Sequence, residues 1–382
     1  MNNAGRKEYA VYVITRHGIK IAESIIKEIP SADLYVSSRF IGEAPRGSFA
    51  MDIPMGPTLE KTFMEYNCHV HIISVGAVVR MIKDLLQNKK VDPAVVCVDD
   101  SAKYSICVLS GHVGRGNYYA KKIASILSAV PVVTTASDSI GTLSVDILGR
   151  ELGWILDDDE RNVTRGCAAV VNSDRIAFIQ EAGEPDFWPL DEHLPDCIRY
   201  FRSLDEAKAE DYDFFLIVSD REFLHSHADH HKKSVIYRPK SLVLGIGCDK
   251  HTPLSVIERG VLYHVEKNYI SLKSVKAVAS IDLKKDEPGI IELCDKYGWD
   301  FVTYPAEVLD RVEGVMNPSE SVKKYTGSKT VAEGACLKLS GAKKLLLTKQ
   351  SFKESHDVHT MTVAFARIPF EVREIDMKVD IN

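Results

Sequence analysis

The sequence predicts an α/β protein, with an N-terminal and a C-terminal three-layer α/β domain joined by a small α+β middle domain. Two observations indicate this fold class. Apolar strands alternate with amphipathic helices near both ends of the 382-residue chain, whereas this alternation weakens between residues 154 and 240. We therefore expect an N-terminal domain at 1–153, the middle domain at 154–240 and a C-terminal domain at 241–382.

The first domain opens with a βαβ unit. Residues 9–14 form an alternating, β-branched strand, apolar residues between 22 and 29 mark one helix face, and residues 34–36 form the next strand. A passage rich in glycine and proline at 42–57 predicts a loop. Four more apolar strands are expected, at 70–75, 93–98, 104–109 and 132–135.

A loop with three glycines and one histidine follows the strand at 104–109, with the sequence Leu109-Ser110-Gly111-His112-Val113-Gly114-Arg115-Gly116-Asn117. Glycine permits close backbone approach to a ligand, and the N–H groups of the following helix N-terminus favour an anion such as phosphate or carboxylate. Ligands of open α/β sheets bind beside the carboxyl ends of strands. We expect a binding site here, where His112 can exchange a proton near neutrality.

Polar residues also follow the neighbouring strands. Gly76, Asp99 and Thr135 each stand at the end of a predicted strand, and Asp138 lies just beyond the last of these. We expect these strand ends to lie beside the His112 loop. Either Asp138 or Asp99 could orient the imidazole, although a turn or cap role is the commoner one for such residues.

Two arginines near these strand ends suit the binding of carboxylates. Arg80 lies early in the helix that follows the strand at 70–75, and Arg115 belongs to the glycine-rich loop. A guanidinium group pairs with a carboxylate in a bidentate way that an ammonium group cannot reproduce. Either arginine could equally be a solvated surface residue.

Composition narrows the function classes. The net charge of −6 argues against a nucleic-acid partner. Eight cysteines are scattered without a C-x-x-C pair, so neither a disulfide framework nor a structural zinc ribbon is expected. The chain leads directly into a folded pattern and has no apolar run of membrane-spanning length. We expect a cytoplasmic protein without a membrane partner.

The middle segment has a helical pattern at 162–171 and strand-like stretches at 175–179 and 214–218, and this weak pattern fits a spacer. It also contains the string H-x-H-x-D-H, the zinc-ligand pattern of metallo-β-lactamase-like hydrolases, formed by His225, His227, Asp229 and His230. The position between two domains and the lysines that follow the string favour a solvated loop instead.

The C-terminal third returns to alternating strands and helices. A new α/β pattern starts at 242–248, after which Thr252 caps and Pro253 opens a helix. Thr330 and Glu333 predict a capping box before the last helix. The remaining strands are expected at 275–281, 344–347 and 361–366.

Taken together, these motifs resemble the cobalt-precorrin-5A hydrolase family of the anaerobic cobalamin pathway. In the first domain the resemblance rests on Gly76-Ala77-Val78-Val79-Arg80, Asp92-Pro93-Ala94-Val95-Val96, Leu109-Ser110-Gly111-His112, Asn117 and Val133-Thr134-Thr135-Ala136. In the last domain it rests on Leu244-Gly245-Ile246-Gly247-Cys248, Ser280-Ile281-Asp282-Leu283-Lys284, Asp286-Glu287-Pro288-Gly289, Val331-Ala332-Glu333 and Thr362-Val363-Ala364. The order of these strings along one chain is more specific than any one of them.

The resemblance implies a three-part chain that opens the δ-lactone of cobalt-precorrin-5A and expels a two-carbon bridge as acetaldehyde, giving cobalt-precorrin-5B. It implies a cobalt-precorrin as substrate, other enzymes of the corrinoid pathway as candidate partners, and no required cofactor, because the substrate carries the cobalt. The loop departs from the family's His-x-Gly-Gly-Ala-Asn, with Arg115 replacing the second glycine and Gly116 the alanine. After Cys248, the family's two basic residues and glycine are replaced by Asp249, Lys250 and His251.

Such a reaction needs an activated water, a site for the oxyanion and anchors for a macrocycle edged with carboxylates. His112 is the candidate base, oriented by Asp138, beside a loop whose backbone N–H groups could hold the oxyanion. The alternative is a histidine that is hydrogen-bonded structurally at a strand end. The candidate substrate contacts of this domain are Gly76, Arg80, Ser110, Gly111, Gly114, Arg115, Gly116, Asn117 and Thr135.

In the C-terminal domain Glu287 is a candidate proton shuttle, and the candidate substrate contacts are Gly245, Gly247, Asp282, Lys284 and Lys285. A charged helix start explains the residues at 282–287 equally well. The two glycines lack the third glycine of a dinucleotide fingerprint, so nucleotide binding is not expected. Cys248 could act as a nucleophile, but a buried strand-end thiol is the commoner case.

Two other functions stay open from the residues alone. One is a non-catalytic carrier that binds corrinoids and passes them between pathway enzymes. The other is a zinc-dependent lactonase that uses the histidine-rich string of the middle segment. The hydrolase interpretation expects no metal that is bound by the protein itself.

Overall fold

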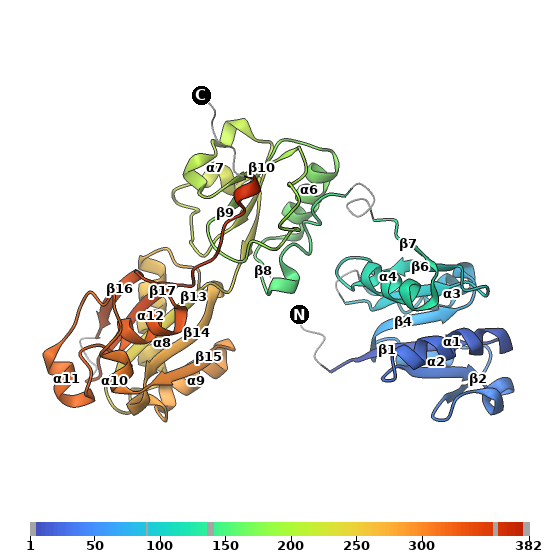
Figure 1. The fold of residues 1–382 in the computed structure, drawn as a ribbon, viewed down its shortest axis with the longest axis horizontal. Coiled ribbons are helices and arrows are strands. Elements are labelled where there is room, and N and C mark those ends of the chain that lie inside the picture. Colours follow the sequence, from blue (N-terminus) through green and yellow to red (C-terminus); the bar gives the residue numbers. More distant parts are fainter. Residues whose placement is uncertain (1–4, 89–90, 136–140, 354–357, 377–382) are drawn as a thin grey trace. The chain divides into compact units, whose positions relative to one another are not determined.

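The computed structural model describes residues 5–88, 91–135, 141–353 and 358–376 (Figure 1). The chain divides into two compact units, Met1–Ile147 and Leu148–Asn382. Within the described residues the strands form three sheets, drawn from 7–132, 155–238 and 242–367. The structure confirms the predicted α/β class, and the predicted domain boundaries fall between the sheets.

The first unit is built on a sheet with the strand order β3-β2-β1-β4-β5-β6-β7, as far as its described residues show. Strands β1 to β5 run parallel, but β6 pairs antiparallel with β5, and β7 runs parallel to β6. The carboxyl ends of β6 and β7 therefore lie at the opposite sheet edge from those of β1, β4 and β5. The strands are β1 (Lys7–Val13), β2 (Asp33–Ser37), β3 (Phe49–Met51), β4 (Tyr66–Ile72), β5 (Ala94–Val98), β6 (Tyr104–Leu109) and β7 (Val130–Val132).

Helices cover both faces of this sheet, so the unit has the three layers that the sequence predicts. Helices α1 (Arg16–Glu28) and α4 (Gly116–Leu127) pack on the face that carries Val11. Helices α2 (Gly56–Thr62) and α3 (Val75–Ile82) pack on the face that carries Tyr12. Both faces are apolar because β1 is buried on both sides and its side chains alternate between them.

The middle segment of the second unit contains a sheet of order β10-β9-β11-β12-β8 among the residues described there. All its strands run parallel except β8, which pairs antiparallel at the edge. The weak sequence pattern predicted α6, β9 and β11 but not β8, β10, α7 or β12, so the segment has more regular structure than a spacer needs. Its elements are β8 (Ile155–Leu156), α6 (Glu160–Val171), β9 (Ile176–Gln180), β10 (Ile198–Phe201), β11 (Phe214–Val218), α7 (Ala228–His231) and β12 (Ser234–Arg238).

The C-terminal part of this unit has a mixed sheet of order β15-β14-β13-β17-β16, counted over the part of the chain that the structure describes. Helices α8 and α9 cover one face and α12 covers the other. The sheet consists of β13 (Leu242–Cys248), β14 (Val275–Ile281), β15 (Asp300–Tyr304), β16 (Leu345–Phe352) and β17 (Met361–Arg367). The helices are α8 (Leu254–Lys267), α9 (Pro288–Tyr297), α10 (Ala306–Leu309), α11 (Glu320–Thr326) and α12 (Ala332–Ser340).

The predicted capping box at the start of α12 is only half right. Thr330 Oγ1 accepts a hydrogen bond from the Gly334 N–H at 2.9 Å. The carboxylate of Glu333 instead accepts from the backbone N–H groups of Met316, Asn317 and Lys349. Burial alone would raise the pKa of Glu333, but the hydrogen bonds that its carboxylate accepts from the Asn317 side chain and from these backbone N–H groups lower it. Glu333 is therefore used to hold a loop and an edge strand together.

Buried charges join the middle and C-terminal sheets within the second unit. Asp157 follows β8 and pairs with both Arg238 and Lys273. Asp220 is fully buried and binds Arg367 of β17 through both carboxylate oxygens, at 2.7 and 2.5 Å. Because a buried charge that loses its partner is strongly destabilising, the pair of buried Asp220 with Arg367 holds the two sheets together as one unit.

Candidate active site

The glycine-rich loop between β6 and α4 is closed by its own backbone. The N–H groups of Arg115, Gly116 and Asn117 donate to the carbonyl oxygens of His112, Ser110 and Gly111, at 2.9, 2.9 and 3.0 Å. Ser110 Oγ donates to the Asp92 carbonyl oxygen at 3.0 Å, which ties the loop to the start of β5. These bonds fix the shape of the loop without the His112 ring.

The glycines of the loop are required by close packing. A Cβ on Gly116 would lie 2.6 Å from the Leu109 carbonyl oxygen, and a Cβ on Gly111 would lie 2.8 Å from Asn117 Oδ1. Arg115 adopts the left-handed region with a φ of 62°. Its guanidinium lies over the Tyr118 ring, 4.4 Å from the ring centroid.

His112 contacts a carboxylate that no sequence pattern marks. Its Nδ1 lies 3.1 and 3.3 Å from the two carboxylate oxygens of Asp146, and the two side chains are only 18% and 16% exposed. Asn117 Nδ2 donates to Thr135 Oγ1 at 2.8 Å, so the segment after β7 also reaches the loop. Asp138, the predicted orienting residue, lies outside the described residues. Asp146 sits in an irregular stretch without periodicity, so sequence reasoning missed it.

Three residues predicted to lie beside His112 are at the other edge of the sheet. Asp99 lies in the turn from β5 to β6, where its carboxylate accepts from the Tyr104 N–H at 2.6 Å. Gly76 and Arg80 follow β4, and Arg80 Nη1 donates to the Gly76 carbonyl oxygen at 2.7 Å. The length of β5 alone separates the two edges by roughly 13 Å. The prediction of one shared site was wrong because β6 runs antiparallel to β5.

The candidate residues of the C-terminal sheet do gather at one edge, since β13 and β14 are parallel neighbours. Lys284 Nζ lies 2.9 Å from Glu287 Oε2, and their side chains are 14% and 4% exposed. Glu287 Oε1 is buried and has no hydrogen-bond partner among the described residues. Asp282 starts the short 3-10 turn before Lys284, and Lys285 is exposed.

The other C-terminal candidates have structural roles. A Cβ on Gly245 would overlap the Ala332 carbonyl oxygen, so this glycine lets α12 pack on the sheet. The Gly247 carbonyl oxygen accepts from Thr362 Oγ1 at 3.3 Å. Burial raises the pKa of Cys248 to about 11, so its thiol is a weak nucleophile near neutrality.

The histidine-rich string does not converge on a metal site. His227 binds Ser226 Oγ through Nδ1 and Asp205 through Nε2, whereas His230 donates from Nε2 to the Ala207 carbonyl oxygen. His225 contacts the Tyr269 ring. No group of three or more His, Cys, Asp or Glu side chains among the described residues could hold a metal ion. The zinc interpretation therefore has no structural support.

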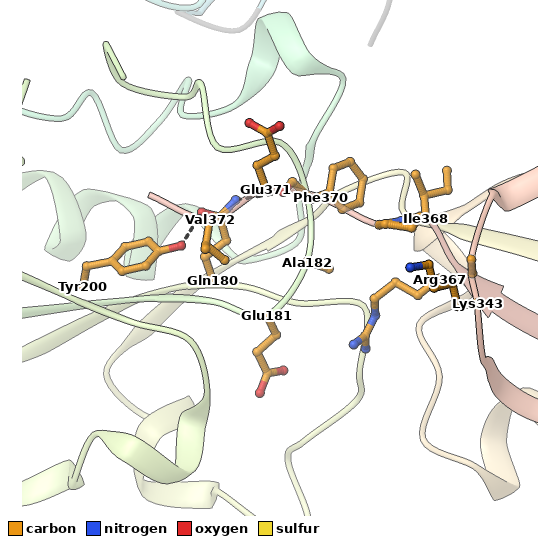
Figure 2. Close-up of a pocket in the computed structure, with 13 residues that line it drawn as sticks. Gln180, Glu181, Ala182, Tyr200, Lys343, Arg367, Ile368, Phe370, Glu371 and Val372 are labelled. Atoms are coloured by element: carbon orange, nitrogen blue, oxygen red, sulfur yellow. Dashed lines mark hydrogen bonds between the residues drawn. The ribbon is translucent and has the colours of Figure 1, made fainter. Parts of the chain in front are cut away.

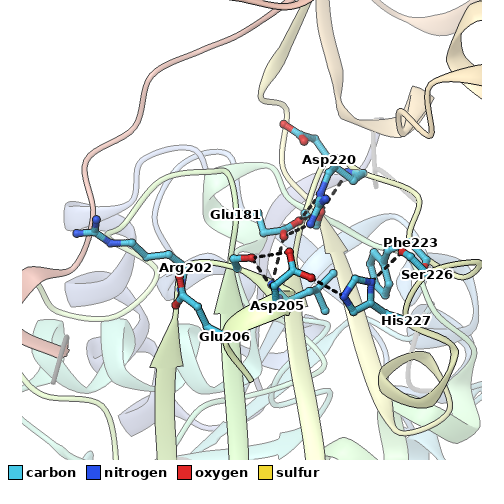
Figure 3. Close-up of polar contacts among 12 residues, drawn as sticks. Glu181, Arg202, Asp205, Glu206, Asp220, Phe223, Ser226 and His227 are labelled. Carbon is cyan, nitrogen blue, oxygen red and sulfur yellow. Dashed lines mark hydrogen bonds and ion pairs between the residues drawn. The ribbon is translucent and has the colours of Figure 1, made fainter. Parts of the chain in front are cut away.

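A polar cluster without a sequence signature lies in the middle sheet (Figure 3). Glu181, just after β9, pairs with Arg221 and accepts from Ser219 Oγ at 2.6 Å. Burial alone would raise the pKa of Glu181, but the hydrogen bonds from Arg221 and Ser219 lower it. Figure 3 also shows the Asp205 to His227 contact. Glu181 thus has its hydrogen-bond partners within the cluster, and so do Asp205 and His227.

A cavity of about 260 Å³ lies between the end of β9 and the segment after β17 (Figure 2). Gln180 donates to the Gly183 and Glu184 carbonyl oxygens and accepts from Tyr200 Oη. None of the predicted site residues lines the cavity. Ligand pockets of enzymes usually measure roughly 300 to 1,000 Å³, so this one is too small for a corrinoid macrocycle.

Comparison with known proteins identifies the family. A curated relative from Priestia megaterium, named cobalt-precorrin-5A hydrolase, is 39% identical over 368 residues, which is 96% of this chain and 96% of the relative. The chain belongs to the cobalamin synthesis G family. Models described as cobalamin synthesis G N-terminal, cobalamin biosynthesis central region and cobalamin synthesis G C-terminus match residues 57–138, 143–239 and 242–366. The resemblance found in the sequence is thus confirmed.

Two further proteins extend the comparison. A cobalt-precorrin-5A hydrolase from Salmonella typhimurium is 29% identical and covers 89% of this chain and 94% of its own. A solved structure of a putative cobalamin biosynthesis protein G homolog from Sulfolobus solfataricus covers 96% of this chain and 99% of its own, at 19% identity and a TM-score of 0.37. In this chain, no helix among the described residues is long and apolar enough to cross a membrane.

Proposed function

We propose that this chain hydrolyses cobalt-precorrin-5A, opening its δ-lactone and releasing acetaldehyde to give cobalt-precorrin-5B. The observation that carries the proposal is the 39% identity to a cobalt-precorrin-5A hydrolase along 96% of both chains. The corrinoid is the partner, with other enzymes of the same pathway as candidate docking partners in the cytoplasm. The cobalt arrives with the substrate, and the protein needs no cofactor of its own.

His112 is the proposed base of the reaction. It takes a proton from water as the water oxygen attacks the lactone carbonyl, and it returns the proton to the alkoxide when the acyl–oxygen bond breaks. Its contact with a carboxylate at 3.1 Å supports this role, because a neighbouring negative charge stabilises the imidazolium that forms. The His112 side chain stays 18% exposed, so a small reactant can reach it.

The loop around His112 is the proposed site for the developing oxyanion. Gly111 and Gly114 carry N–H groups that bind no acceptor within the described part of the chain. Such preorganised donors stabilise charge that appears only in the transition state. Ser110, Gly116 and Asn117 hold the loop in shape.

The C-terminal cluster is the proposed place for a group of the substrate that donates a hydrogen bond. Lys284 is the cation of this cluster, and Glu287 next to it keeps one buried oxygen without a partner among the described residues. A polar atom of this kind is costly to bury, so a donor from a ligand would stabilise it. The binding roles of Arg80, Arg115 and Lys285 stay predictions.

Release of acetaldehyde from cobalt-precorrin-5A under anaerobic conditions tests the proposal. The purified wild type should form one aldehyde per substrate, with or without chelator, and His112→Ala should lose this activity. His17→Ala, which removes an exposed histidine of the same unit, is the matched control and should stay active. Tight binding without aldehyde would instead favour a carrier, and loss of activity with chelator would favour the zinc lactonase.

A further inference from the structure

We propose that Asp146 is a positioning residue that sets the tautomer of His112, an inference that rests on the proposed function. Asp146 Oδ1 and Oδ2 lie 3.1 and 3.3 Å from His112 Nδ1. A carboxylate can only accept hydrogen bonds, so Nδ1 must carry the proton of this contact. In a neutral imidazole the other nitrogen, Nε2, is then the atom that accepts a proton from the reacting water.

The contact is not needed to build the loop. The backbone bonds of Arg115, Gly116 and Asn117 close the loop, and Ser110 anchors it to the start of β5. None of these bonds uses the His112 ring. The pair of His112 and Asp146 is therefore not what closes this turn of the chain.

The location of the pair also favours a functional role. Both side chains are more than four-fifths buried but not sealed, so the field of the Asp146 carboxylate is little screened at His112, and the imidazole is still within reach of a reactant. When His112 takes up a proton, the carboxylate becomes the counter-charge of the new imidazolium. This division of work between a base and the acid that orients it is the logic of the serine protease triad.

The test is Asp146→Asn, examined for kinetics and for the His112 tautomer. The Asn amide can donate to Nδ1, which places the His112 proton on Nε2 and removes the acceptor. We expect kcat to fall by about 10²- to 10⁴-fold with KM nearly unchanged. The residual activity should have its acid limb at lower pH, since the imidazolium has lost its counter-charge.

Long-range ¹H–¹⁵N spectra of the histidine rings read the tautomer without any substrate. The His112 signals are assigned by their absence in His112→Ala, and the wild type should show a protonated Nδ1. Asp146→Glu keeps a carboxylate acceptor and should retain the wild-type tautomer and part of the activity. Asp84→Asn is the matched control, because this carboxylate of the same unit is 85% exposed, and it should change neither measurement.

The outcomes separate this inference from the proposed function. An active wild type whose kcat and tautomer survive Asp146→Asn would overturn the role of Asp146 and leave the hydrolase intact. Loss of kcat in both Asp146→Asn and Asp146→Glu with an unchanged tautomer would also overturn it, since the residue would then be structural. A wild type that releases no acetaldehyde overturns the hydrolase, and the spectra alone then decide on Asp146.

Discussion

Replacing His71 by phenylalanine should remove about half of the acid sensitivity that two buried histidines give the first unit. His71 lies on β4, is fully buried, and stacks on Tyr12 with ring centroids 4.7 Å apart. Neither of its ring nitrogens has a hydrogen-bond partner among the described residues. Burial, together with the neighbouring His69, lowers the pKa of His71 from 6.5 to about 3. Phenylalanine keeps a flat ring against Tyr12 and loses no hydrogen bond.

The sign of the effect follows from proton binding. Burial lowers the pKa of His69 to about 4, so the folded unit leaves both imidazoles neutral at pH 5. The unfolded chain protonates them below pH 6.5, so the stability is fully present above pH 6.5 and falls as the pH drops toward 4. Between pH 7 and pH 5 each imidazole should cost about 1.9 kcal/mol of unfolding free energy. His71→Phe should therefore reduce the loss over this range by about 1.9 kcal/mol.

The assay is urea unfolding read by thiol labelling with 4,4′-dithiodipyridine at pH 5 and pH 7. Cys68 and Cys97 are fully buried in β4 and β5, so the labelling of these two cysteines, followed separately from the other six by peptide mass spectrometry, reports the opening of the first unit. All three tryptophans belong to the second unit, and their fluorescence is an internal control. His17→Ala should behave as wild type, because this ring is exposed in the folded and the unfolded chain alike. An equal pH dependence in His71→Phe and wild type would refute the reasoning.

Two further substitutions test the second unit, both through the urea midpoint of tryptophan fluorescence. Gly245→Ala should lower the unfolding free energy by about 3 kcal/mol, because the new Cβ pushes α12 off the sheet at Ala332. An unchanged midpoint would mean that α12 does not contact the sheet there. Arg373→Met should lower the unfolding free energy by about 3 to 5 kcal/mol, because it removes a buried guanidinium that pairs with Asp376. The same guanidinium donates to the carbonyl oxygens of Pro185, Trp188, Pro189 and Glu192. A stable Arg373→Met would show that the C-terminal segment is not anchored by this residue.

Periodicity predicted the elements whose burial is apolar and missed those with buried polar groups. The strands expected at 104–109, 242–248 and 275–281 match β6, β13 and β14. β4 begins at Tyr66 instead of residue 70, because its buried His69 and His71 look polar in a sequence. In the middle segment β12 ends in a buried arginine, and β8 has only two residues, so neither gives an alternating pattern.

The direction of β6 was the decisive error at the site, and the sequence did contain the signal. Only residues 99–103 connect β5 to β6. A parallel neighbour needs a crossover of about a dozen residues, whereas a hairpin needs only a few. A connection of this length therefore requires an antiparallel pair. The length of the connection alone is enough to place Asp99 and Arg80 at a different edge from His112.

Because β6 is reversed, carboxyl ends of strands lie at both edges of the first sheet. Each edge is therefore a possible ligand site of an open α/β sheet. At one edge the chain leaves the neighbouring strands β1 and β4 toward opposite faces of the sheet. This is the topological switch point, and Gly76 and Arg80 lie there. At the other edge the reversed β6 carries its glycine-rich loop to the start of β5. Strand topology cannot choose between them, but chemistry can, because only the second edge joins a histidine to a largely buried carboxylate among the described residues. Asp146→Asn therefore tests both a residue and the choice of edge.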